Sequence, residues 1–149
     1  MGFIIPWIKK GNINKMIKLN FKNYDCLDQP IYDKEQNFFI YGRPLGVAVH
    51  WIAGNIPVLG VISLFQALLT KNRNIVKVPY NFQNILPQIL KDLAQTKFFK
   101  RKNRKIIDLF LNSTLVVYAD KEDIDSQNLL SKKADIRIVW GGIDAVNSV

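Results

Sequence analysis

The sequence has few of the residues that mark a chemistry by themselves. It contains one cysteine, Cys26, and one histidine, His50, among 149 residues. A single cysteine excludes an internal disulfide and favours a reducing compartment, so we expect the protein in the cytoplasm. Neither a metal-ligand spacing nor a Ser-His-Asp set can be assembled from the residues present. The sequence therefore predicts no metal centre and no serine hydrolase site.

Long apolar runs are also missing. The stretch from Ile56 to Leu69 is shorter than the roughly 20 residues that a membrane span needs. The apolar residues 1–8 have no basic residue before them and contain a proline, unlike a signal peptide. No membrane span is therefore expected. Without internal repeats or low-complexity tracts, a 48% hydrophobic chain of this length predicts one domain with a substantial core.

Acidic residues are scarce relative to basic ones, with 12 against 21 and a formal net charge of +9. Six of the basic residues lie between Lys97 and Lys105, a run without an acidic residue and with two phenylalanines. This run is the basis of an alternative hypothesis, a non-catalytic basic module that binds nucleic acid or another partner. Charge runs usually lie in water, and no nucleic-acid fold signature is present. We therefore favour a solvated loop or helix end and expect no specific nucleic-acid partner.

The most informative stretch runs from Leu45 to Pro79. Gly46–Ile52 is predicted to be a strand, the following Gly, Asn and Pro residues a turn, and Val58–Leu69 a helix. The helix is apolar on nearly every face, so we expect it to be buried on most sides. A second strand is predicted at Ile75–Val78, which completes a right-handed βαβ unit with parallel strands.

The rest of the chain continues this alternation. The pattern predicts helices at 84–95, 106–111, 121–132 (capped by Asp120) and 143–149, and strands at 114–118 and 136–140. The predicted fold class is therefore α/β, with an open, mostly parallel Rossmann-like sheet and helices on both faces. Residues 1–41 are mostly polar and weakly periodic, and they predict an irregular N-terminal arm with one short helix and a short strand at 38–41.

Ligands of such sheets bind at the carboxyl ends of the strands, which here are residues 52–57, 77–80 and 140–143. Asn55 lies between a strand end and a helix start. Its amide could donate to an oxyanion, or it could simply cap the helix. The residues alone leave both roles open.

Lys77 is a charged residue in an otherwise apolar strand. It either reaches the strand end and meets an anion or hydroxyl groups, or it lies on an edge strand in water. Gly141-Gly142 would allow a pyrophosphate to approach the backbone, although the pair is not G-x-G-x-x-G and also suits a plain turn. His50 is predicted to be a hydrogen-bonded core residue, and Cys26 to have no functional role.

The stretch HWIAGNIPVLGVISLFQALLTKNRNIVKVP, which begins at His50, resembles the core of the acyl-CoA reductase (LuxC) family, a branch of the aldehyde dehydrogenase superfamily. The similarity lies in the GNxP turn, the apolar helix containing Ser-Leu, and the N-x-N-I-V-K-type strand. It continues more weakly through residues 134–142, so it covers about residues 42–149. The resemblance implies that this part of the chain is an incomplete NADP(H)-binding domain.

The resemblance implies the cofactor-binding part of a fatty acyl-CoA reductase. The whole enzyme would reduce acyl-CoA or an acyl-protein to a fatty aldehyde with NADPH, through an intermediate in which the acyl group is bound to a cysteine as a thioester. Its nucleophilic cysteine would lie in a second domain that this chain does not contain, so we expect the chain alone to be inactive. The complete enzyme would form a homo-oligomer. Another oxidoreductase of the aldehyde dehydrogenase type remains the alternative within this class.

The resemblance also implies roles for single residues. It implies that Asn55 is the catalytic residue that donates a hydrogen bond to the oxyanion. Lys77 matches the lysine that binds the adenosine ribose, but Val78 follows it where proline is common, and Tyr80 replaces the usual acidic residue. This departure favours NADPH over NADH, although NADH remains possible. The expected cofactor contacts come from the three strand ends: Ile52, Ala53, Lys77, Pro79, Gly141, Gly142 and Ile143.

Overall fold

The computed structural model describes residues 9–21, 23–52, 57–79, 85–95, 101–120, 122–147 and 149. The chain divides into two compact units, Met1–Pro44 and Leu45–Val149. Each unit has hydrophobic clusters of its own. Every helix among the described residues is too short or too polar to span a bilayer.

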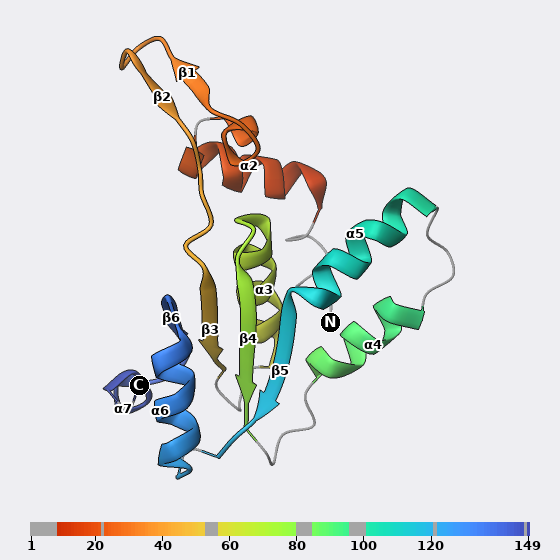
Figure 1. Cartoon of the computed structure of the whole chain (residues 1–149), viewed down its shortest axis with the longest axis vertical. Helices are drawn as coiled ribbons and strands as arrows, with labels where there is room; N and C mark the ends of the chain where they lie inside the picture. The colour runs from red at the N-terminus through yellow and green to blue at the C-terminus, as the bar shows by residue number, and fades with distance from the viewer. Residues whose placement is uncertain are drawn as a thin grey trace. The chain divides into compact units, whose positions relative to one another are not determined.

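The first unit is more regular than the irregular arm expected from the sequence. It contains helix α2 (Lys10–Phe21), the 3₁₀ helix η1 (Tyr24–Leu27) and an antiparallel hairpin of β1 (Ile31–Asp33) and β2 (Phe38–Ile40) (Figure 1). A small core of residues from these elements holds the unit together: Ile17, Cys26 and Leu27, with Ile13, Phe21, Ile31 and Ile40 around them. Each element contributes too few apolar residues to give a periodic signal, because the core forms only when they meet.

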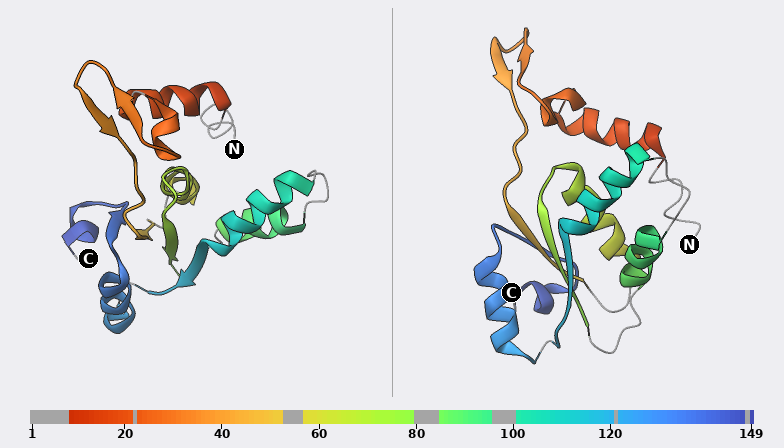
Figure 2. Two further views of the ribbon diagram at one scale, coloured as in Figure 1. Left: turned by 45° about the horizontal axis from the view of Figure 1, so that its top comes forward. Right: turned by 45° about the vertical axis from the view of Figure 1, so that its right-hand side comes forward.

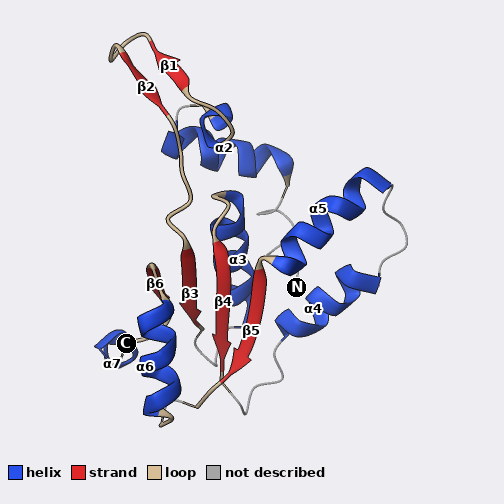
Figure 3. Cartoon of the chain, in the orientation of Figure 1, coloured by secondary structure: helices blue, strands red, loops and turns tan. Residues whose placement is uncertain are grey.

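The second unit is built on a four-stranded sheet in which all neighbouring strands are parallel (Figure 3). The strands are β3 (Val47–Trp51), β4 (Arg73–Val78), β5 (Thr114–Tyr118) and β6 (Ile136–Val139). Their order in the sheet is β5-β4-β3-β6. The predicted parallel sheet is confirmed, and its two central strands are the ones predicted for the βαβ unit.

Helices cover both faces of this sheet (Figure 2). One face packs against α3 (Pro57–Leu69), α4 (Ile85–Gln95) and α5 (Arg101–Asn112), and the other packs against α6 (Ile124–Lys133). The short helix α7 (Ile143–Asn147) follows β6. Because alternate side chains of an extended chain point to opposite faces, β3 contributes Val49 and Trp51 to the α6 side, and Ile52, the residue after β3, packs on the α3 side. The predicted α/β class with helices on both faces is confirmed.

Helix α3 is less enclosed than the sequence predicts. Gly60, Ser63, Leu64 and Ala67 are buried, whereas the other described side chains of the helix are half-buried or, at Gln66, exposed. One row of the helix faces the sheet, and the described residues cover its remaining sides only in part. The uniformly apolar sequence could not reveal which row would be inside.

Two helix starts differ from the predictions. Helix α5 begins at Arg101, so part of the basic run is helical, and Arg104 pairs with Asp108 at 3.0 Å one turn later. Helix α6 is capped by Asp123, whose carboxylate accepts a hydrogen bond from the backbone N–H of Ser126 at 3.1 Å. Asp120 is therefore not the cap; its carbonyl accepts from the Gln127 side chain instead.

Candidate functional site at the carboxyl edge of the sheet

The strand order places a topological switch point between β3 and β6. From β3 the chain adds β4 and then β5 on one side, and it returns to add β6 on the other side of β3. The crossover helices α3, between β3 and β4, and α6, between β5 and β6, therefore pack on opposite faces of the sheet. In open α/β sheets this arrangement creates a crevice at the carboxyl edge where ligands bind. The sequence could not predict this point, because it depends on the position of β6.

Ile52 directly follows β3, the first of the two strands that flank the switch point. It is 4% exposed, and its backbone N–H donates to the Lys77 carbonyl at 3.2 Å. Ala53 and Asn55, two further predicted site residues, lie outside the described residues. Helix α3 begins at Pro57, and both roles considered for Asn55 stay predictions.

Gly141 and Gly142 follow β6, the second strand beside the switch point. They differ in the space that is available for a side chain. A Cβ atom at Gly141 would lie 2.7 Å from the Cβ of Ala145, whereas a Cβ at Gly142 would meet no atom within 4 Å. Packing therefore explains Gly141, and the space beside Gly142 is open to a ligand. Ile143 begins α7 and is 71% exposed. Because α7 has only five residues, its dipole adds little to anion binding.

Lys77 lies on the central strand β4, which rules out the edge-strand alternative. It is 7% exposed and pairs in register with Trp51, so strand alternation places its side chain on the α6 face. Burial lowers the pKa of Lys77 from its ordinary value of 10.5, and the carboxylates of Asp120 and Glu122 partly oppose this shift. Pro79 follows at the strand end and is half-buried. The carboxyl edge thus carries one buried cation beside two carboxylates.

His50 is a fully buried, hydrogen-bonded residue, as predicted. Its Nδ1 lies 2.7 Å from the Ser63 Oγ, and its Nε2 lies 3.1 Å from the Asn74 Oδ1. The Asn74 Nδ2 donates to the Asn72 carbonyl, which leaves its Oδ1 to accept from the His50 Nε2–H. The Nδ1 then accepts from the Ser63 hydroxyl. This arrangement satisfies a neutral imidazole and leaves no atom of the ring for catalysis.

Stability should fall as the pH drops below about 6.5 because of His50. Burial lowers the pKa of His50 from 6.5, with the Asn74 hydrogen bond partly opposing it. Below pH 6.5 the unfolded chain takes up a proton that the folded chain resists, so acid favours unfolding. We expect the free energy of unfolding in urea to decrease between pH 7.5 and 5.5. This decrease should largely vanish in His50→Gln, because glutamine does not titrate; an equal decrease in both proteins would contradict the assignment.

Two tryptophans meet at the switch point. The backbone N–H of Trp140 donates to the Trp51 carbonyl at 2.9 Å, which extends the β3–β6 ladder by one bond. The Trp51 indole donates to the Gln127 Oε1 at 2.7 Å on the α6 face. Trp140 packs against the cluster on the other face. Trp140 lies in the 140–143 stretch expected at the carboxyl edge, but no role was expected for its side chain, and Asp120 was predicted only as a helix cap.

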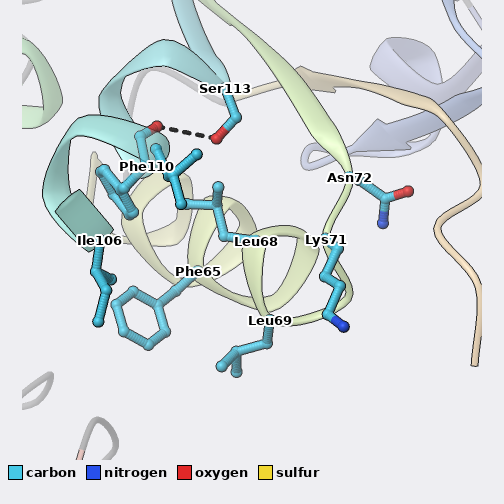
Figure 4. A pocket seen from close by; sticks show the side chains of 9 residues that line it. Phe65, Leu68, Leu69, Lys71, Asn72, Ile106, Phe110 and Ser113 are labelled. Carbon is cyan, nitrogen blue, oxygen red and sulfur yellow. Dashed lines mark hydrogen bonds between the residues drawn. The ribbon is translucent and has the colours of Figure 1, made fainter. Parts of the chain in front are cut away.

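An apolar pocket of about 440 Å³ lies at the opposite edge of the sheet, between α3 and α5 (Figure 4). Lys71 and Asn72 precede β4, and Ser113 precedes β5, so the pocket is at the amino ends of these strands. Its polar groups already have partners: the Ser113 hydroxyl donates to the Phe110 carbonyl, and the Asn72 Oδ1 accepts from the Leu45 backbone. The pocket therefore does not suit a dinucleotide. Within the described residues, no group of acidic, histidine or cysteine side chains could hold a metal ion.

Comparison with known proteins gives a consistent result. The family model described as "Acyl-CoA reductase (LuxC)" matches residues 3–149. The chain is 26% identical over 147 residues to a long-chain acyl-protein thioester reductase of Aliivibrio fischeri, covering 94% of the chain and 28% of the relative. The corresponding protein of Photorhabdus luminescens is 29% identical over 139 residues, or 93% of the chain and 27% of the relative. The chain thus spans little more than a quarter of the length of these relatives.

Proposed function

Because the chain belongs to the acyl-CoA reductase (LuxC) family, we propose that its second unit binds a nicotinamide dinucleotide in a reductase of long-chain acyl thioesters. NADPH is the proposed cofactor, with NADH as the alternative. The observation that carries the proposal is the switch point between β3 and β6, where α/β sheets bind such ligands. The acyl donor is proposed to be acyl-CoA or an acyl-protein, since the relatives are named for acyl-protein thioesters.

Residues at the carboxyl edge fit this cofactor. Gly142 leaves open space beside the backbone, as a pyrophosphate needs. Lys77 provides a cation on β4, which β3 separates from β6, and the nearby Asp120 and Glu122 favour its charged form. These carboxylates are also suitable acceptors for ribose hydroxyls, which is the reason to keep NADH as the alternative.

Bound NADPH would supply the hydride that reduces the acyl group to the aldehyde, with release of the thiol. We propose that Asn55 donates its amide N–H to the developing oxyanion, as its counterpart does in the aldehyde dehydrogenase superfamily that the chain resembles. Such a reaction also needs a cysteine nucleophile. Cys26 is 1% exposed within the core of the first unit and does not serve. We therefore place the nucleophile outside these 149 residues, and we propose that the whole enzyme is a homo-oligomer.

Replacing Lys77 by methionine tests the cofactor site. Loss of a charge-assisted contact should weaken NADPH binding roughly 10- to 100-fold, because the 2′-phosphate is the group that a cation recognises best. NADH, which lacks this phosphate, should lose less than about threefold. The measurement is isothermal titration of each nucleotide into the 149-residue chain.

Lys71→Met is the matched control. Lys71 is an exposed lysine just before the start of β4, whereas Lys77 is near the end of the same strand. It should leave both affinities unchanged. Equal losses for the two nucleotides in Lys77→Met would place Lys77 on the shared ribose hydroxyls and make NADH the better candidate. If neither nucleotide binds the unmodified chain, the proposed function is wrong.

A further inference from the structure

One buried hydrogen-bond donor is left without a partner. Among the residues that the structure describes, the indole Nε1 of Trp140 is the buried side-chain nitrogen or oxygen atom that makes no hydrogen bond. Buried donors are nearly always paired in native proteins, because leaving one unpaired is costly. A donor kept in this state therefore indicates a partner that is absent from the isolated chain, such as a ligand.

The position of Trp140 suggests where that ligand lies. Trp140 directly follows β6, and its backbone N–H bonds to the last residue of β3, so it borders the switch point. Its side chain packs against a cluster that includes Ile52 and Val78, at the carboxyl ends of β3 and β4, and Leu86 in the first turn of α4. The unpaired donor is therefore at the edge of the sheet where the cofactor is proposed to bind.

The neighbouring tryptophan shows that the fold can satisfy an indole here. Trp51 pairs in register with Val139, the residue before Trp140, and its Nε1 donates to the Gln127 Oε1 at 2.7 Å. The two indoles lie on opposite faces of the sheet, and only the Trp51 indole has a hydrogen-bond partner. Helix α6 supplies an acceptor to Trp51 on one face, whereas no described residue supplies one to Trp140 on the other.

We propose that the indole N–H of Trp140 donates a hydrogen bond to an oxygen of the dinucleotide bound at the switch point. This inference rests on the proposed function and adds to it a residue that contacts the cofactor. The ligand offers diphosphate, ribose and carboxamide oxygens, all of which are acceptors. The free protein leaves this donor unpaired, so no hydrogen bond has to be broken when the ligand binds. The whole free energy of the new hydrogen bond would therefore contribute to the affinity.

The test compares Trp140→Phe with Trp51→Phe in the 149-residue chain. Phenylalanine keeps an aromatic ring and removes only the donor and the second ring. Trp140→Phe should bind NADPH about tenfold more weakly, whereas Trp51→Phe should bind it as the unmodified chain does. The order should reverse in urea unfolding without ligand: Trp51→Phe loses a hydrogen bond and should shift the midpoint further than Trp140→Phe.

Two further measurements identify the bond itself. In ¹⁵N-labelled chain, NADPH should move the Trp140 indole proton resonance downfield and slow its exchange with solvent. Titration with 2′-phospho-ADP-ribose, which lacks nicotinamide, then separates the acceptors: a tenfold effect of Trp140→Phe here places the acceptor in the diphosphate or ribose, and no effect places it in the carboxamide.

The possible failures are distinct. If the unmodified chain binds NADPH and Trp140→Phe binds it equally well, the inference is wrong and the proposed function stands. If the unmodified chain binds no nicotinamide dinucleotide, the proposed function fails and the inference fails with it.

Discussion

Replacing Asn55 by alanine should lower the kcat of a full-length reductase that carries this segment about 100- to 1000-fold, the usual cost of removing one oxyanion-hole donor. The amide would act on the charge that develops at the thioester oxygen, so kcat should fall more than the affinity for the acyl substrate. The measurement is single-turnover reduction of an acyl thioester at saturating NADPH, which isolates the chemical step from product release.

Asn55→Asp is the control that separates catalysis from helix capping. Aspartate caps a helix as well as asparagine does, but its carboxylate cannot donate a hydrogen bond. We therefore expect Asn55→Asp to keep its stability and to be at least as inactive as Asn55→Ala. Turnover close to normal in Asn55→Asp, together with a stability loss of about 1 kcal/mol in Asn55→Ala, would support capping instead.

Replacing His50 by leucine should lower the free energy of unfolding by about 3 kcal/mol, which is more than 100-fold in the folding equilibrium. Leucine fills most of the ring volume but leaves the Ser63 hydroxyl and the Asn74 Oδ1 without the partners they have in the structure. Both of these residues are almost fully buried, so water cannot replace the lost hydrogen bonds. Urea unfolding at pH 7.5 measures the change.

A combined variant tests whether the cost comes from unpaired polar atoms. His50→Leu with Ser63→Ala and Asn74→Leu removes all three polar partners, and replacing a whole buried set by apolar groups is far less costly than removing one member. The combined variant should therefore be more stable than His50→Leu alone. If it is less stable by the sum of the single losses, packing rather than hydrogen bonding explains the role of His50.

The local pattern of the sequence determined the elements of the second unit. Its strands are short apolar runs rich in β-branched residues, and helices such as α4 have a three-four apolar spacing. Alternation of the two types requires a parallel sheet with helices on both faces, so the fold class followed without any tertiary information. The first unit was not predictable in this way, because its core combines one to three apolar residues from each of several short elements.

The tertiary structure alone decided where a ligand can bind and which residues surround that place. Pairing of β6 with β3 joins Trp51 to Trp140, which are distant in sequence, and so creates the switch point. Pairing of β4 with both β3 and β5 makes β4 a central strand, which buries Lys77 and brings it near the carboxylate of Asp120. Sequence patterns report which side chains prefer burial, but they do not report the strand order, because that order depends on long-range pairings. The unpaired indole of Trp140 is a consequence of that order, and no local pattern could have shown it.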